Sequence, residues 1–309
     1  MNIIRTKDLL QEACYGSGDV HQMTDEERSR LQHHLLEMYK EIEAVCVKHN
    51  LTVMLAYGSV LGAIRHGGFI PWDDDMDLFM PRKDYELLIN VYADELPEHL
   101  KVYAPNCANG TFGRFAKVID TRTKFIPAGV EDTGSPKQGI FVDIFPLDSI
   151  PNSPLRNKVC RFVGMALMYI GSSVSQYKSN SPLYRKLMMH STPTKVNYWL
   201  RQTLGFMFSF MSYQRWMNLV DSFCANDKPT GYVSDLLGDY TWRPIPVDEF
   251  CPPSTGKFEG ATVFLPHQPI KHLERYYGNW QWIPPEEDRW QHFIREIRFF
   301  DNTNDNIKK

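Results

Sequence analysis

An acidic run inside an apolar stretch constrains this chain more than any other feature of its sequence. Residues 55–81 read LAYGSVLGAIRHGGFIPWDDDMDLFMP, so an apolar run ends in Gly58-Ser59, a glycine-rich connection follows, and an extended segment carries the acids. Because side chains alternate across a strand, we expect Asp73, Asp75 and Asp77 on one face, with the apolar residues that follow pointing into the core. Three carboxylates on one face either take up protons or are neutralised by a cation.

The acidic run has two interpretations. Most acidic runs are solvated turns on a wet surface. A turn would not continue as MDLFM at 76–80, which has the alternation of a half-buried strand, and it would leave Gly58-Ser59 without a role. We therefore favour a metal site, in which oxygen ligands hold a hard cation, Mg2+ or as the alternative Mn2+.

A further carboxylate stands inside a second apolar run, GIFVDIFPLD at 139–148. Burying Asp143 there is costly unless it meets a cation or a network of donors. Pairing of this run with the acidic strand would set Asp143 beside Asp75 and Asp77 as a further metal ligand. The alternative is an edge-strand acid that faces water. Asp148, which closely follows a proline, is expected to cap a turn.

The stretch that follows Gly58-Ser59 could bind phosphate. Residues 59–65 are expected to form a helical turn, whose free amide groups and positive dipole end favour an anion. Arg65 lies at its end and could touch the same phosphates. The neighbouring His66 could do so as well, or could equally be a residue of a surface loop.

Two further basic residues lie in GRFAKVIDTRT at 113–123, where residues 114–119 read as a strand. Arg114 and Lys117 are three apart, so an extended segment would place them on opposite faces. At most one of them would then reach the phosphates, unless the strand bulges. We favour Lys117, and an exposed strand lysine is the alternative.

Composition places the chain among ordinary globular proteins. Of its 309 residues, 43% are hydrophobic and 23% charged, and the net charge of -3 lacks the basic balance that general nucleic-acid binding favours. The six cysteines form no CxxC pair, so neither a zinc ribbon nor a disulfide framework is indicated. Without an apolar leader or a run long enough to span a bilayer, we expect a cytoplasmic protein. Residues 162–176 are expected to form a buried helix, but with the aromatic-rich 203–217 they leave open a peripheral contact with the inner face of the membrane.

The order of helical and extended patterns predicts an α+β fold, with a mixed sheet flanked by helices and an added helical lobe. Thr24 and Glu27 form a capping box, so an amphipathic helix is expected at 25–49. Strand signals disappear beyond about residue 150 and return beyond about residue 231. We therefore expect a catalytic core at 1–150, a helical lobe at 151–230, and a mixed segment at 231–309 that packs back on the core.

The string YGSVLGAIRHGGFIPWDDDMDLFM resembles the LicD family, a branch of the nucleotidyltransferase superfamily. This family includes bacterial phosphocholine transferases and, more distantly, fukutin-like ribitol-phosphate transferases. GIFVDIFPLD and FEGATVFLP, the latter at 258–266, are similar to the same family, so the resemblance runs from about residue 24 to about residue 298. It implies a nucleotidyltransferase-like sheet whose acids hold metal, a glycine-serine turn that holds a nucleotide phosphate, and an acceptor bound over the helical lobe.

The resemblance also implies a reaction. A phospho-alcohol, with phosphocholine from CDP-choline favoured, would pass from a CDP-activated donor to a glycan or glycolipid acceptor such as lipopolysaccharide, teichoic acid or capsule, with release of CMP. The catalytic residues would be Asp75, Asp77 and Asp143. The metal ligands would be Asp73, Asp75, Asp77 and Asp143. The residues that bind the donor would be Gly58, Ser59, Arg65, Lys117 and Glu259, the last of these by resemblance only.

Two other functions stay open. A conventional nucleotidyltransferase would use the same acids to add NMP to a small molecule and would release pyrophosphate. A catalytically silent glycan-binding protein could keep the fold, although the full set of acids argues against it. The cationic group of a choline donor would need an aromatic cage, whereas the alcohol of CDP-ribitol or CDP-glycerol would need hydrogen-bonding side chains. The candidates for such a cage are Trp242, Trp280, Trp282, Tyr240 and Tyr276.

Overall fold

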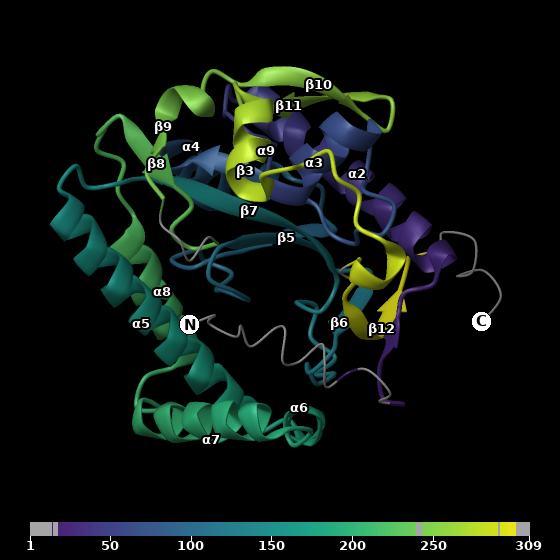
Figure 1. Ribbon diagram of the computed structural model, residues 1–309, viewed down its shortest axis with the longest axis vertical. Helices are drawn as coiled ribbons and strands as arrows, with labels where there is room; N and C mark the ends of the chain where they lie inside the picture. Colours follow the sequence, from purple (N-terminus) through teal and green to yellow (C-terminus); the bar gives the residue numbers. More distant parts are fainter. Residues whose placement is uncertain (1–13, 15–17, 239–242, 290, 301–309) are drawn as a thin grey trace.

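The computed structural model describes residues 14, 18–238, 243–289 and 291–300. A mixed sheet forms the centre, helices cover it, and a group of helices extends from it (Figure 1). The prediction of an α+β fold with a mixed sheet is confirmed.

The central sheet draws strands from both halves of the chain. These strands are β2 (Met54–Leu55), β3 (Asp77–Pro81), β4 (Leu100–Tyr103), β5 (Ala116–Asp120), β7 (Ile140–Ser149), β8 (Tyr232–Ser234) and β9 (Ile245–Pro246). The main path runs in the order β2-β3-β7-β5-β4, and β8 and β9 extend it beyond β7. Strands β3 and β7 are parallel, whereas β2 pairs with β3, and β5 with both β7 and β4, in antiparallel fashion.

The first long helix, α2 (Asp25–Lys48), begins at the expected capping box. Thr24 Oγ1 accepts the backbone N–H of Glu27 at 3.2 Å, and the Glu27 carboxylate accepts the N–H of Thr24 at 2.9 Å. The prediction of an amphipathic helix at 25–49 is therefore confirmed. Shorter helical segments flank β3, and these are α3 (Tyr57–His66), α4 (Arg82–Leu87), the π-helical turn Leu88–Tyr92 and the 3-10 turn Ala93–Glu95.

The C-terminal part packs back on this core. Strands β10 (Ser254–Phe258) and β11 (Ala261–Leu265) form a hairpin, and α9 (Pro269–Tyr277) lies beside α3 (Figure 1). A small second sheet contains β1 (His21–Gln22), β12 (Phe293–Arg298) and β6 (Lys124–Pro127), and 3-10 turns occur at Val247–Glu249 and Glu286–Asp288. The hairpin residues Phe258, Val263 and Leu265 belong to the same buried apolar cluster as the inward face of α2.

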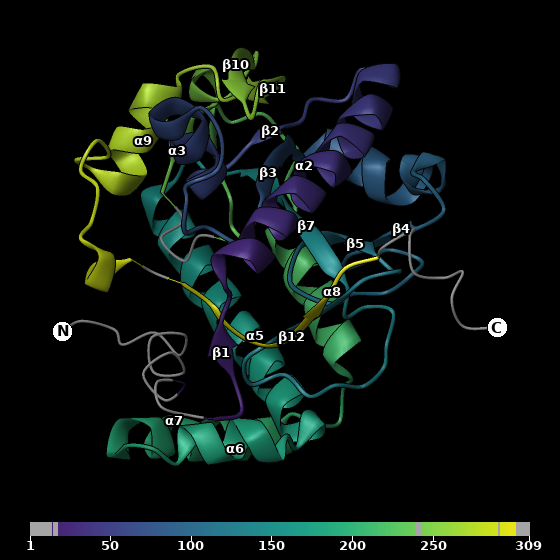
Figure 2. The same ribbon diagram turned by 90° about the vertical axis from the view of Figure 1, so that its right-hand side faces the viewer.

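The helical lobe consists of α5 (Pro154–Ser179), α6 (Pro182–Met188), α7 (Thr192–Met207) and α8 (Tyr213–Cys224). Helix α5 packs against both α7 and α8, while α6 and α7 lie together at the end of the molecule farthest from the central sheet (Figures 1 and 2). The expected burial of residues 162–176 holds on one face of α5 only. Met168 and Val174 are buried there, whereas Phe162 is 75% exposed.

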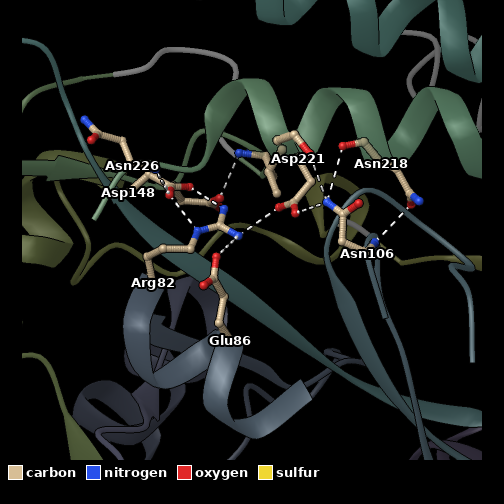
Figure 3. Close-up of polar contacts among 10 residues, drawn as sticks. Arg82, Glu86, Asn106, Asp148, Asn218, Asp221 and Asn226 are labelled. Atoms are coloured by element: carbon tan, nitrogen blue, oxygen red, sulfur yellow. Dashed lines mark hydrogen bonds and ion pairs between the residues drawn. The ribbon is translucent and has the colours of Figure 1, made fainter. Parts of the chain in front are cut away.

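A buried ion-pair network joins the core to the helical lobe (Figure 3). Arg82, at the start of α4, donates from Nε and Nη2 to the two carboxylate oxygens of Asp148 in β7, each at 2.7 Å, and from Nη1 to Asp221 Oδ1 in α8 at 2.8 Å. Asn106 and the backbone N–H of Asn226 donate to the same two acids. The expectation that Asp148 caps a turn is wrong, because this acid lies within β7, fully buried, and Arg82 neutralises it.

Candidate functional site

Three adjacent strands bring two acids and a lysine to one level of the central sheet. Asp77, the first residue of β3, lies opposite Asp143 of β7, and Asp143 lies opposite Lys117 of β5. Directly opposed residues share a face of a sheet. Lys117 Nζ lies 2.5 Å from Asp143 Oδ1, and their side chains are only 12% and 14% exposed. The pair is therefore largely shielded from bulk water, which strengthens its electrostatic interaction.

The other acids of the run lie close to this pair. Burial, followed by repulsion from Asp75, raises the pKa of Asp73, and burial, followed by the charges of Asp75 and Asp143, raises the pKa of Asp77. Burial raises the pKa of Asp75 to about 6 and also raises the pKa of Asp143, against the opposing charge of Lys117. The expectation that Asp73 and Asp75 share a strand face with Asp77 is wrong, because β3 begins only at Asp77 and the other two acids lie in the loop before it. Their mutual electrostatic influence still indicates that Asp73, Asp75, Asp77 and Asp143 lie near one another, and we call them the carboxylate cluster, whose negative charge favours a cation.

The first turn of α3 packs against the carboxylate cluster. The buried Ser59 accepts the backbone N–H of Asp77 on Oγ at 3.0 Å. A Cβ on Gly58 would fall 2.9 Å from Asp73 Oδ2, so glycine permits this close approach of the Asp73 carboxylate. The positive end of the α3 dipole therefore lies beside the acids. Binding of phosphate by Gly58 and Ser59 stays a prediction, and Ser59 would contribute its hydroxyl hydrogen, since its oxygen already accepts a bond.

Arg65 connects α3 to the C-terminal part of the chain. Its Nη1 donates to the carbonyl oxygens of Trp280 and Trp282, both at 3.0 Å, and its Nε donates to His66 Nε2 at 3.0 Å. Burial lowers the pKa of Arg65, while the nearby Asp73 acts in the opposite direction. Arg65 is therefore within electrostatic reach of the carboxylate cluster, and its contact with the donor stays a prediction. His66 is the last residue of α3 and not part of a loop.

The expected strand at 114–119 begins two residues later than the sequence suggested. Because β5 starts at Ala116, Arg114 lies before the strand, and the alternation of side chains along β5 does not fix its direction. Lys117 and Arg114 both oppose the rise in the pKa of Asp143, so both cations lie near this acid. Arg114 Nη1 also donates to Met168 Sδ at 3.6 Å, and which of the two cations would reach a phosphate stays a prediction.

Glu259 lies at the tip of the β10–β11 hairpin and contacts the loop that follows α3. Its Oε1 accepts the backbone N–H of Phe69 at 3.1 Å, and its own N–H donates to the carbonyl of Gly67 at 2.8 Å. A Cβ on Gly68 would overlap the Glu259 carboxylate. Gln32 of α2 holds the far side of the same loop through the carbonyl oxygens of residues 70 and 73. An influence of Glu259 on the donor, which stays a prediction, would therefore act through this loop.

Tyr277 is a site residue that the sequence pattern did not single out. Although 41% of the Tyr277 surface is exposed, burial around its phenol raises the pKa of this group, and the charges of Asp73, Asp77 and Asp75 raise it further. The phenol at the end of α9 is therefore near the carboxylate cluster. The residue stands in LERYYGNW, where no local pattern distinguishes it from the preceding tyrosine.

Asp74 turns toward a different partner from its neighbours in the acidic run. Its Oδ1 lies 2.7 Å from Nδ1 of His292, which immediately precedes β12. One ligand atom each from Asp74, Asp75 and His292 lie within 4.8 Å of one another, which holds for no three acids of the carboxylate cluster. Among the described residues, this group is therefore the one whose present geometry fits a metal ion. Asp75 thus adjoins both groups, and His292 carries no sequence signal because its partner lies 218 residues away.

The candidate aromatic cage is only partly described. Tyr240 and Trp242 lie outside the described residues. Tyr276 packs against the rings of Tyr57 and His272, with centroids 5.2 and 4.7 Å apart. Trp280 packs partly buried against the main core, and Trp282 is 58% exposed. Packing thus accounts for Tyr276 and Trp280, and the cage stays a prediction.

Comparisons with known proteins find relatives over part or most of the chain. Residues 50–160 match the family model described as LicD/FKTN/FKRP, nucleotidyltransferase domain. The chain is 29% identical over 268 residues to the lipopolysaccharide cholinephosphotransferase LicD of Haemophilus influenzae, and the match covers 84% of this chain and 94% of that protein.

Shorter matches, 36% identical over 50 residues, join 16% of this chain to uncharacterized proteins of Rickettsia prowazekii and Rickettsia typhi, of which they cover 19% and 16%. The family match contains both strands of the carboxylate cluster, and the Haemophilus relative extends the similarity over most of the chain. Residues 50–160 therefore form a domain of the LicD/FKTN/FKRP type, and the chain is similar to a LicD protein over most of its length.

Proposed function

We propose that the protein transfers phosphocholine from CDP-choline to a hydroxyl group of a cell-surface glycan or glycolipid, with release of CMP. The observation that carries this proposal is the register that sets Asp77 beside Asp143 and Asp143 beside Lys117 within the carboxylate cluster. The Haemophilus influenzae relative is named a lipopolysaccharide cholinephosphotransferase, which supports phosphocholine as the group that is moved.

The donor set fits a divalent metal ion such as Mg2+, with Mn2+ as the alternative. The cluster offers carboxylate oxygens, which suit hard cations. Burial and mutual repulsion raise the pKa of its acids, and a bound cation would offset that repulsion. Asp75 and Asp77 would hold the ion, with Asp73 nearby and Asp143 completing the set. When bound, the ion would neutralise charge on the donor diphosphate.

The protein's own groups would position the reactants and move one proton. Asp143 would accept the proton of the acceptor hydroxyl, because its raised pKa suits a general base, and Lys117 would hold its carboxylate in place. The acceptor oxygen then bonds to the phosphorus that bears choline, the bond from this phosphorus to the bridging oxygen breaks, and CMP leaves. The first turn of α3 and Arg65 would hold phosphate oxygens, so catalysis rests on position and charge.

The test is a product analysis with purified protein, CDP-choline, Mg2+ and a lipopolysaccharide acceptor. We expect CMP to appear in step with choline attached to the glycan. Asp77→Asn and Asp143→Asn should each lower kcat/KM by at least about 100-fold. Asp248→Asn, which changes an exposed acid in the turn Val247–Glu249, is the matched control and should leave kcat/KM unchanged.

Other products would reassign the reaction. Release of pyrophosphate in place of CMP would support addition of NMP to a small molecule. Turnover of CDP-ribitol or CDP-glycerol but not CDP-choline would change the donor. Glycan binding without turnover of any donor would support a silent glycan-binding protein.

A further inference from the structure

The charges of this chain are strongly segregated along its sequence. Between Asp148 and Asp221 there is no aspartate or glutamate, while lysine and arginine occur nine times. All 37 acidic residues of the chain therefore lie outside this segment. The segment supplies α5, α6, α7 and most of α8, so the helical lobe carries positive charge and the rest of the chain carries negative charge.

Helix α7 is amphipathic, and its apolar side faces outward. Its inner face is buried: Gly205 lies against α5, where an added Cβ would collide with the carbonyl oxygen of Ser173, and Tyr198 packs with Tyr184 of α6. The opposite face exposes large apolar side chains at helical spacing. With their exposed fractions these are Val196 (64%), Trp199 (56%), Leu200 (50%), Phe206 (65%) and Met207 (60%). Phe210, 77% exposed, lies three residues beyond the end of the helix.

Exposed basic side chains occur on α7 and on the neighbouring α6. Lys195 is exposed on α7 itself, and Arg185 and Lys186 are exposed on α6. The two α6 residues also line a recess with Pro182 and Met189, and Lys186 Nζ lies 2.5 Å from Asp19 Oδ2. Because α6 and α7 lie side by side in both views, apolar and basic groups occupy the same end of the molecule (Figures 1 and 2).

We propose that this end, made of the outward face of α7, Phe210 and the basic residues of α6, lies on the surface of an anionic lipid bilayer. Exposed aromatic and aliphatic side chains enter the boundary between headgroups and acyl chains, and lysine and arginine attract anionic headgroups. Within the described residues, no helix combines enough length with enough apolarity to cross a bilayer, so the contact is with the interface. A second copy of the chain fits this surface less well, because two basic faces would repel.

The inference deepens the proposed function by assigning the lobe a partner. A lipid-bearing acceptor, of the kind named for the Haemophilus relative, would be met at the membrane that holds its lipid portion. The vesicle contact itself requires neither donor nor acceptor, so it can be tested with no reaction taking place. Its failure is thereby distinguishable from failure of the proposed transfer.

The test is co-sedimentation of the full chain with phosphatidylcholine vesicles that contain or lack phosphatidylglycerol. We expect binding to the anionic vesicles that weakens as salt is raised, with little binding to the neutral ones. Trp199→Ser combined with Phe206→Ser should lower the partition coefficient at least about tenfold, because it removes two large aromatic side chains from the inserted surface. Lys195→Gln combined with Arg185→Gln should weaken binding to anionic vesicles selectively.

Val196→Gln and Val47→Gln form a matched pair, since both change a valine that is more than half exposed on a helix, and only the first lies on α7. The first should lower binding and the second should not. Thermal unfolding monitored by circular dichroism confirms that each variant is folded. Absence of binding by the folded wild-type chain, or an equal loss in both valine variants, would overturn the proposal. So would a dimer in light scattering that dissociates in the α7 variants.

Discussion

Replacing Arg82 by methionine tests how the core and the helical lobe are held together. Arg82 is 3% exposed, Asp148 is fully buried, and Asp221 is 5% exposed. Methionine fills much of the same space but supplies none of the donors that reach the two acids. Two buried carboxylates are then left without their cation, at the joint between β7 and α8.

The expected cost is large and depends on pH. Removing one partner of a buried ion pair destabilises a protein by about 3–5 kcal/mol. Burial raises the pKa of Asp148 even beside Arg82, and loss of the cation raises it further. A carboxyl group whose folded pKa is raised keeps a proton that the unfolded chain releases, so stability falls as pH rises. The cost of Arg82→Met should therefore grow between pH 5 and pH 7, by at most about 1.4 kcal/mol per pH unit for each acid.

Urea unfolding at pH 5, 6 and 7, followed by circular dichroism, measures this cost. Arg82→Met combined with Asp148→Asn should recover part of the stability and flatten the pH dependence, because one of the uncompensated charges is gone. Arg298→Met is the control, since its side chain is 67% exposed and pairs with Glu296 on the surface; its effect should stay within about 1 kcal/mol. A cost for Arg82→Met that is below about 1 kcal/mol, or that does not grow with pH, would refute this reasoning.

Three further predictions concern the site and its support. Lys117→Met should lower kcat/KM and move the acid limb of the pH–rate profile upward, because Lys117 lowers the pKa of Asp143; an unmoved acid limb would contradict the base role of Asp143. Gly68→Ala should lower Tm, because the added Cβ overlaps the Glu259 carboxylate, and adding Glu259→Ala should restore part of the lost Tm. Equal Tm values for the single and double variants would disprove this. Burial lowers the pKa of His272 to about 3, so below pH 6.5 the unfolded chain takes up a proton that the folded chain does not. The wild-type chain should therefore lose up to about 1.4 kcal/mol of stability per pH unit below pH 6.5. His272→Leu should lack this loss when urea unfolding is compared at pH 5 and pH 6.5. Parallel pH dependences of the two proteins would count against it.

Local patterns predicted the parts of the fold that depend on neighbours in sequence. The capping box at Thr24 set the start of α2, because its hydrogen bonds join residues three apart. The meeting of Asp77 and Asp143 followed from alternation within two short apolar runs, once both were read as neighbouring strands.

Residues whose partners lie far along the chain escaped prediction. Asp148 resembled a turn acid, because its neutralising Arg82 is 66 residues away. Tyr277 and His292 reach the acidic run only through tertiary packing of α9 and the C-terminal segment. Arg114 was expected within a strand, but β5 begins two residues later, because sequence patterns locate the ends of an element less well than its centre.

The β10–β11 hairpin holds the loop after α3 in place, and its contacts with this loop can form only late in synthesis. During synthesis on the ribosome, residues 67–69 emerge long before Glu259, whose carboxylate and backbone hold them. The apolar contacts of Phe258, Val263 and Leu265 with the core also arrive late. A nascent chain that stops near residue 160 would contain every acid of the carboxylate cluster and would still lack the β10–β11 hairpin that holds their loop. The proposed transfer activity should therefore be among the last properties that the growing chain acquires.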